Sequence, residues 1–364
     1  MDNQKNVNLY KSRNSNIELL RILMMIMIIA HHYVVNSGIT EMYDFNNITG
    51  NMIFLQIFGF SGKTMINGFL LISGYFMVKH KTSLKKIIRL FFQIKFYVFV
   101  IYIIMIIIGI ETLSIKSVLS AIFSLIKNVN VGFTATFFLL YIIMPFLNRF
   151  VMSIDRKQYI FLLVILFFFY TLIPTFFIVN DTFNEIGWYI TVYLYGAYIR
   201  LYMDDLKLSG KQSLIIIVIN IALIIASILC LDYLNYNPYH MVTNANKLFA
   251  VTLSISLFFI FKNLHMGYNK VVNMLAQATF GVLLIHANSN AMREFLWVKL
   301  LNVTSLYESD YLVFHAIISV LAIYTICSVI ELLRIKFIEK PFLNYICNTK
   351  IYHKANNLFN LLWN

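Results

Sequence analysis

Charged residues are scarce in this sequence. They make up 12% of its 364 residues, whereas soluble globular proteins carry about 25%, and apolar residues make up 60%. The mean hydropathy is +0.75. These values exclude an ordinary soluble domain and indicate an integral membrane protein. Since a transmembrane helix needs about 20 apolar residues, we expect an all-α, polytopic helix bundle with about ten transmembrane helices.

Cysteine is also rare. The three cysteines, Cys230, Cys327 and Cys347, are far apart in the sequence, which excludes a disulfide framework and gives no cysteine-based metal cluster. A cleaved leader is not indicated, because the apolar run from Ile17 to Val35 is long enough to span a membrane and no small-residue cleavage site follows it. We therefore expect an uncleaved first helix and no metal cofactor.

The positive charges lie in alternate segments of the chain. If the N-terminus is cytoplasmic, 21 of the 29 Lys and Arg residues fall on the cytoplasmic side. This positive-inside pattern predicts a multi-pass protein of the cell membrane with an even number of spans and cytoplasmic tails at about residues 1–16 and 344–364. It also accounts for most of the net charge of +13. The basic clusters lie beside helix ends, which favours membrane lipid over nucleic acid as their partner.

Hydrophobic segments of helical length recur along the chain. The expected helices cover residues 17–36, 64–78, 89–110, 135–152, 159–179, 187–203, 212–231, 247–262, 271–290 and 311–335.

The first helix contains ionisable residues, which are costly inside a membrane and for that reason informative. His32 follows Arg21 by 11 residues, so both lie on one face about 16 Å apart, while His31 points about 80° away. Glu18 precedes Arg21 by three residues and is placed to form an ion pair with it. The alternative interpretation is that Arg21 is an anchor at the membrane surface and His32 a packed core histidine.

The ninth helix contains a second polar set. Thr279, His286 and Asn290 are spaced by seven and four residues, which predicts one stripe along a helix that runs outward. The alternative is that this stripe only forms hydrogen bonds inside the bundle.

Several stretches together resemble the membrane acyltransferase-3 family. The stretch from Asn16, NIELLRILMMIMIIAHH, resembles the family's first helix, and NGFLLISGYFM resembles its second, followed by a basic run that ends at Arg89. The late stretch TFGVLLIH and the closing IEKPF resemble further family elements in the same order. The resemblance extends from about residue 16 to residue 343.

The resemblance implies an activity. Members of the family move an acyl group, commonly acetyl, from cytoplasmic acyl-coenzyme A to a hydroxyl of a sugar that ends up outside the cell. We therefore expect residues 1–364 to form a single transmembrane acyltransferase domain of the stand-alone type. Its co-substrate would be acetyl-CoA or another acyl-CoA, and its acceptor a cell-surface polysaccharide or glycoside.

The resemblance also suggests roles for residues. We expect His32 to be the catalytic base or an acyl relay, and Arg21, oriented by Glu18, to contact coenzyme A. The remaining expectations are an acceptor site formed by His286, Thr279 and Asn290, and a coenzyme A phosphate site formed by Arg89, Lys85 and Lys86.

Two other classes of membrane protein compete with this interpretation. A polysaccharide polymerase or flippase would also be multi-span and basic on the inside, but a flippase usually has twelve or more spans and a polymerase has large outer loops. A transporter would show internal symmetry, and no convincing repeat is present. The sequence leaves open which glycan is acylated, the acyl group and the oligomeric state.

Overall fold

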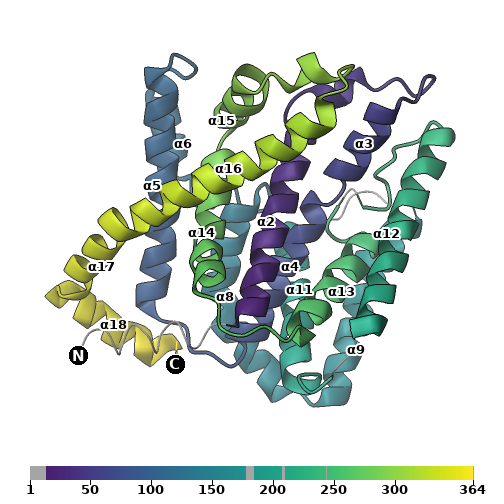
Figure 1. Cartoon of the computed structure of the whole chain (residues 1–364). Helices are drawn as coiled ribbons and strands as arrows, with labels where there is room; N and C mark the ends of the chain where they lie inside the picture. The colour runs from purple at the N-terminus through teal and green to yellow at the C-terminus, as the bar shows by residue number, and fades with distance from the viewer. Residues whose placement is uncertain (1–13, 178–183, 207–209, 243, 364) are drawn as a thin grey trace. The chain divides into compact units, whose positions relative to one another are not determined.

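Every regular element in the described part of the chain is a helix. The computed structural model describes residues 14–177, 184–206, 210–242 and 244–363, whose course is shown in Figure 1. The prediction of an all-α protein is confirmed, and each of the ten expected segments overlaps a helix.

The helices group into two units, which are described separately. Unit 1 comprises the chain up to Phe69, Pro174–Phe177 and Leu206–Ser328, and unit 2 comprises Leu70–Ile173, Ile178–Asp205 and Val329–Asn364. The division falls within α4 (Gly62–Met77) and α16 (Leu312–Arg334). The other elements of unit 1 are α2 (Ser15–Val35), η1 (Ile39–Met42), α3 (Gly50–Gly59), α12 (Gly210–Tyr233), α13 (Leu248–Asn263), α14 (Lys270–His286), α15 (Asn290–Arg293), η3 (Glu294–Leu300) and η4 (Val303–Leu306). Those of unit 2 are α5 (Leu84–Ile107), α6 (Ile115–Ile122), α7 (Ser124–Lys127), α8 (Phe133–Ser153), α9 (Arg156–Phe167), η2 (Phe168–Leu172), α11 (Glu185–Tyr202), η5 (Ile335–Glu339), α17 (Lys340–Cys347) and α18 (Lys350–Trp363), and α10 (Ile173–Phe176) lies at a boundary.

Helix α2 packs along α14, α13 and α3 in unit 1 (Figure 1). Leu20, Met24 and Ile29 are buried, as expected for a helix that is apolar on several faces. At its start, the side-chain amide of Asn16 donates to the carbonyl of Phe261 at 2.7 Å. The same carbonyl also accepts from the N–H of Leu264 at the C-terminal cap of α13, so a polar residue at the start of α2 holds the two helices together.

The register of α2 and α14 brings distant residues together. Ser15 Oγ accepts a hydrogen bond from the backbone N–H of Asn269 at 2.8 Å, where both helices begin. Seventeen residues further along each helix, His32 and His286 meet. Since both helices rise about 1.5 Å per residue, equal steps from a shared start end at the same level. The two helices therefore run parallel, and their register sets the contact between the histidines.

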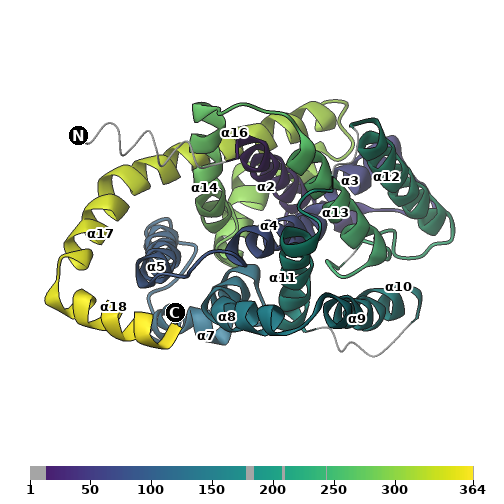
Figure 2. The same cartoon turned by 90° about the horizontal axis from the view of Figure 1, so that it is seen from below.

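In unit 2, α11 lies side by side with α8 and with α9 (Figure 2). The part of α4 that belongs to this unit also approaches α11, through a pair of glycines. A Cβ on Gly74 would collide with the carbonyl of Tyr193, and a Cβ on Gly196 would collide with that of Leu71. Glycine at both positions thus permits backbone contact, which gives the Ser-Gly-Tyr stretch around Gly74 a structural reason.

The expected number of about ten spans differs from what the structure contains. Among the described residues, seven helical segments are long and apolar enough to cross a membrane, and α14 with the segment after it adds an eighth only as a pair bent by 96°. Helix α13 has 16 residues and is about 24 Å long, shorter than a membrane core of about 30 Å. Helix α11 contains five tyrosines, whose hydroxyls lower its hydropathy. Helical periodicity therefore identified the helices correctly, while the expected number of about ten spans is not confirmed.

Candidate active site

Two histidines from distant parts of the sequence form the centre of the candidate site. Nδ1 of His32 in α2 lies 2.9 Å from Nε2 of His286 in α14, and the ring centroids are 5.1 Å apart. His286 is fully buried, while His32 keeps part of its surface exposed. His32 therefore faces another helix of unit 1, and its ring has a defined orientation.

The hydrogen bonds determine where the protons are. Nδ1 of His286 lies 2.6 Å from the carbonyl of Val282, which can only accept, so this nitrogen carries the proton. In a neutral imidazole the other nitrogen, Nε2, is then an acceptor, and His32 must donate from Nδ1. Nε2 of a neutral His32 is consequently unprotonated. No described residue forms a hydrogen bond with it, so it can take a proton from a substrate.

His31 has a separate contact, as its expected orientation implies. Its Nδ1 lies 2.5 Å from the carbonyl of Gly59 in α3, to which it donates. Gly62 lies against the same ring, and a Cβ at Gly62 would collide with it. His31 is thus held between α2 and the α3–α4 junction, and its contacts are those of a packing residue.

The expected ion pair at the start of α2 is present. Arg21 Nη1 lies 3.4 Å from Glu18 Oε1. The Glu18 side chain is buried with 8% of its surface exposed, and that of Arg21 is 29% exposed. The other carboxylate oxygen of Glu18 is buried and has no hydrogen-bond partner among the described residues. Because α2 is continuous, the pair stands about 16 Å along the helix from His32 and does not contact it.

The expected stripe of Thr279, His286 and Asn290 is wrong in part. Helix α14 ends at His286, and Asn290 begins α15 after a bend of 96°. Ser289 caps the new helix, its hydroxyl accepting from the N–H of Met292, and so stabilises the break. Thr279 remains on α14 two turns before His286, and its hydroxyl donates to the carbonyl of Ala276 at 2.9 Å.

The bend also brings in Arg293, which no sequence motif singled out. The guanidinium of Arg293, at the end of α15, is close enough for its charge to act on both His32 and His286. Its Nε is buried and has no hydrogen-bond partner among the described residues. Arg293 follows His286 by seven residues, which was a possible signal in the sequence. Only the bent backbone shows that Arg293 lies close to the two histidines.

Tyr33 is the second residue that sequence reasoning missed. It is fully buried next to His32 in the sequence, its hydroxyl lies 2.9 Å from Nδ1 of His315, and its ring packs edge-on against Trp297 at 5.9 Å. These contacts fix the end of α2 and thereby the position of His32.

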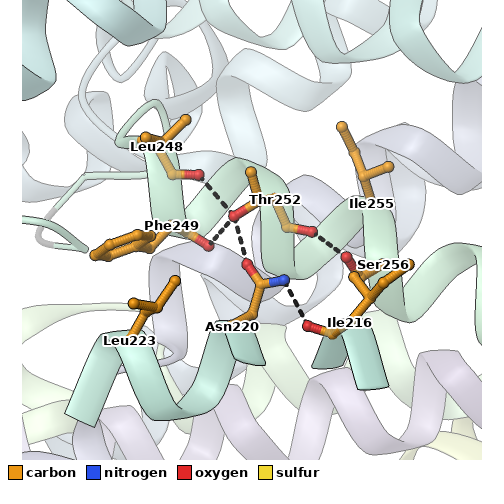
Figure 3. Close-up of a pocket in the computed structure, with 8 residues that line it drawn as sticks. All are labelled: Ile216, Asn220, Leu223, Leu248, Phe249, Thr252, Ile255 and Ser256. Atoms are coloured by element: carbon orange, nitrogen blue, oxygen red, sulfur yellow. Dashed lines mark hydrogen bonds between the residues drawn. The ribbon is translucent and has the colours of Figure 1, made fainter. Parts of the chain in front are cut away.

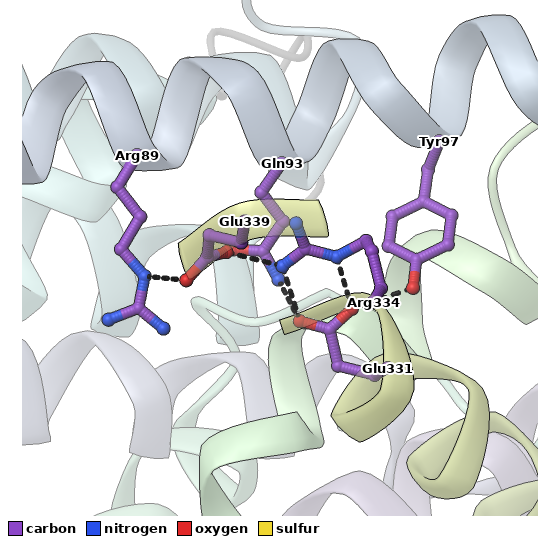
Figure 4. Close-up of polar contacts among 6 residues, drawn as sticks. All are labelled: Arg89, Gln93, Tyr97, Glu331, Arg334 and Glu339. Atoms are coloured by element: carbon purple, nitrogen blue, oxygen red, sulfur yellow. Dashed lines mark hydrogen bonds and ion pairs between the residues drawn. The ribbon is translucent and has the colours of Figure 1, made fainter. Parts of the chain in front are cut away.

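The three basic residues expected to bind phosphate lie on α5, in unit 2. Lys85 and Lys86 are exposed and form no ion pair among the described residues. Arg89 donates from Nε to Glu339 Oε1 at 2.6 Å, which leaves its two terminal nitrogens directed away from the carboxylate (Figure 4). The closing IEKPF stretch thus supplies a partner for Arg89.

Glu339 also belongs to a buried charge network, which consists of Arg89, Gln93, Tyr97, Glu331, Arg334 and Glu339 (Figure 4). Arg334 binds Glu331 with two hydrogen bonds, of 2.7 and 2.8 Å, and Glu339 with one of 2.5 Å. Gln93 and Tyr97 donate to Glu331 at 2.9 and 2.6 Å. Two positive and two negative charges balance, as a buried ionic cluster requires.

An apolar pocket of about 370 Å³ lies between α12 and α13 (Figure 3). Its polar side chains bond to one another and to the backbone: Thr252 donates to Asn220 at 2.6 Å, and Ser256 donates to the carbonyl of Thr252. Asn220 donates in turn to the carbonyl of Ile216. Neither histidine of the pair lines this pocket, and we assign it no catalytic role.

Comparison with known proteins decides the family. The family model for the acyltransferase domain of the acyltransferase-3 family matches residues 14–332. The chain belongs to the acyltransferase-3 family. No curated protein and no solved structure was found to match it.

As an acyltransferase-3 protein with apolar helices of membrane-spanning length, the chain is an integral membrane acyltransferase that uses an acyl donor. Among its described residues, no group of three or more His, Cys, Asp or Glu side chains is arranged to hold a metal ion. The polar groups of the candidate site in unit 1 are the histidine pair, Arg293 and the Glu18–Arg21 pair.

Proposed function

We propose that this protein is an O-acyltransferase that moves an acyl group, acetyl in the simplest case, from cytoplasmic acyl-coenzyme A to a hydroxyl of an extracytoplasmic polysaccharide or glycoside. The observation that carries the proposal is the chain of hydrogen bonds from the carbonyl of Val282 through His286 to His32. It leaves one nitrogen of His32 as a base in a fixed orientation, which acyl transfer to an alcohol requires.

In the proposed reaction, Nε2 of His32 takes the proton from the acceptor hydroxyl as its oxygen attacks the thioester carbonyl. A C–O bond forms, the C–S bond breaks, and the proton passes from His32 to the departing thiolate of coenzyme A. The charge of Arg293 lies near the imidazoles and would stabilise the oxyanion of the tetrahedral intermediate. His286 then acts as a positioning residue, because both of its ring nitrogens are engaged.

The same nitrogen of His32 can instead accept the acyl group and pass it to the acceptor. In that route Nε2 attacks the thioester, an acyl-imidazole forms as the thiolate leaves, and the sugar hydroxyl then displaces the imidazole. Rapid acid quenching with labelled acetyl-coenzyme A distinguishes the two routes. Label covalently bound to the wild-type protein and absent from His32→Ala supports the relay, whereas its absence from both supports the general base.

We propose two contacts for the donor. Glu18 holds Arg21 near the start of α2, where its guanidinium has donors left for a phosphate of coenzyme A. On α5 of unit 2, Lys85, Lys86 and the free terminal nitrogens of Arg89 form a basic group of the kind that binds phosphates. Contacts of Thr279 and Asn290 with the acceptor remain predictions.

The test is transfer of label. Membranes that contain the protein are incubated with labelled acetyl-coenzyme A, and label is measured in the isolated surface glycan. The acyltransferase is supported if His32→Ala abolishes the transfer of label and His31→Ala retains it. Polymer length that changes without incorporation of label would instead indicate the polymerase or flippase.

A further inference from the structure

A second buried polar cluster lies in unit 1, apart from the histidines. Gln56 in α3 donates from Nε2 to Asp232 Oδ1 at 2.9 Å, near the end of α12. Both side chains are buried, with 0% and 1% of their surface exposed. Tyr43, just after η1, and Tyr239, in the segment before α13, place their hydroxyls next to each other and within reach of the charge of Asp232.

The cluster contains more acceptors than the protein satisfies. Oδ2 of Asp232 and Oε1 of Gln56 are both buried and have no hydrogen-bond partner among the described residues. The hydroxyls of Tyr43 and Tyr239 are likewise buried and without a hydrogen-bond partner among the described residues. Buried polar atoms without a partner are rare in folded proteins, so the cluster has bonding capacity left for a ligand that both donates and accepts. Burial above all raises the pKa of the Tyr43 and Tyr239 hydroxyls, which stay protonated and add two donors.

The position of the cluster relates it to the end of α2 that carries the histidines. Gln56 precedes Gly59 by three residues in α3, and the carbonyl of Gly59 accepts from His31. One turn of α3, about 4.5 Å along its axis, therefore separates the level of Gln56 from the level of His31. Tyr43 follows the end of α2, so the cluster lies beyond the histidines, at the opposite end of α2 from Glu18.

The chemistry of the cluster fits a polyol. Two acceptor oxygens in one cluster match the hydroxyl donors of a polyol, whereas a phosphate or carboxylate ligand would be repelled by Asp232. Tyrosine rings beside the hydroxyls suit the apolar face of a sugar ring. We propose that Gln56 and Asp232, with Tyr43 and Tyr239 beside them, bind neighbouring hydroxyls of the acceptor sugar and present the next hydroxyl to the histidine pair. This inference rests on the proposed function.

The experiment compares the Michaelis constants of donor and acceptor. The purified protein in lipid nanodiscs receives labelled acetyl-coenzyme A together with methyl β-glucoside, methyl β-galactoside or methyl β-N-acetylglucosaminide. Asp232→Asn replaces an acceptor oxygen with an NH₂ donor at nearly constant volume. We expect it to raise the KM of the glycoside at least about tenfold, because the sugar loses one hydrogen bond to a charged group. The KM of acetyl-coenzyme A should stay within about twofold of the wild-type value.

Controls separate binding from folding. Asp310→Asn, the same change at an exposed position of unit 1, should leave both constants unaltered. If Asp232→Asn does not insert, Gln56→Met removes the other acceptor at similar length and should raise the same constant. If the glycoside KM is unchanged in variants that do insert, the inference is overturned, and ordered water is the ligand of the two oxygens. The proposed function would still stand. If the wild-type protein transfers no label to the three glycosides or to the surface glycan of the producing cells, the proposed function fails and the inference with it.

Discussion

The histidine pair of unit 1 and the charge network of unit 2 are both buried polar clusters, but they are satisfied to different degrees. In the network, each carboxylate oxygen of Glu331 and Glu339 has a donor and the charges balance. In the histidine pair, the groups are joined by single hydrogen bonds, and Nε2 of His32 remains without a partner among the described residues. Carboxylates with every oxygen bonded hold helices in place, even though Nη1 of Arg334 has no hydrogen-bond partner among the described residues. An oriented base with a free nitrogen can react.

The largest expected effect is that of His32→Ala. Removal of a general base usually costs about 10² to 10⁴ in rate, and removal of an acyl acceptor abolishes the reaction. We expect acyl transfer to disappear while the protein still inserts into the membrane, as measured by label transfer and by the amount of membrane-bound protein. His31→Ala should have a much smaller effect, since His31 bonds to Gly59. Retained activity in His32→Ala would remove His32 from the mechanism.

Arg334→Met should have the opposite effect to His32→Ala, because it should lower the stability of the protein without removing a reacting group. It leaves Glu331 buried without its cation and Glu339 with Arg89 alone, and breaking such a buried pair costs about 3–5 kcal/mol of stability. We expect a large fall in the unfolding temperature of the detergent-purified protein. The control is Arg200→Met, which breaks the partly exposed pair with Asp204 and should cost about 0.2–1 kcal/mol. A variant of Arg334 that is stable but inactive would place the network in the reaction instead.

His286→Ala should reduce the rate less than His32→Ala does. The base remains, but its ring loses the partner that fixes its proton, and misplacement of a reacting group costs about 100-fold. His286→Gln offers an amide oxygen to His32 and should recover part of the rate. Val282→Ala keeps the backbone carbonyl and should be close to wild type. Equal activity of the Gln and Ala variants would exclude the proposed orienting bond.

Arg21→Lys tests whether the inner end of α2 binds the donor. Lysine keeps the charge but not the planar fork, and loss of one hydrogen bond to a charged group corresponds to about a tenfold rise in the KM of acetyl-coenzyme A. The KM of the acceptor should not change. If lysine serves equally well, Arg21 is a membrane anchor.

The smallest effect is expected for Lys85→Ala and Lys86→Ala. Both side chains are exposed, so each contact is worth about 0.2–1 kcal/mol, which is a rise in the KM of the donor of about 1.4-fold to fivefold. The difference from wild type should diminish as salt is added. An effect that does not depend on salt would argue against phosphate binding.

Much of the fold was predictable from local pattern. Apolar runs indicated each of the ten expected helical segments, because burial in lipid or protein leaves a continuous signal in the sequence. The pairing of Glu18 with Arg21 followed from their spacing on one helix. The break after His286 was not predicted, because the run continues through Ala287 and the bend depends on how the following segment packs.

The sequence by itself determined that the chain is helical and apolar, and which ionisable residues each helix carries, since these depend on composition and on periods of a few residues. Only the tertiary structure decided that His32 meets His286, that Arg293 lies near both, and that Asp232 meets Gln56. His32 and His286 are 254 positions apart in the sequence, and Gln56 and Asp232 are 176 positions apart. They depend on the register and packing of separate helices, which no local period encodes.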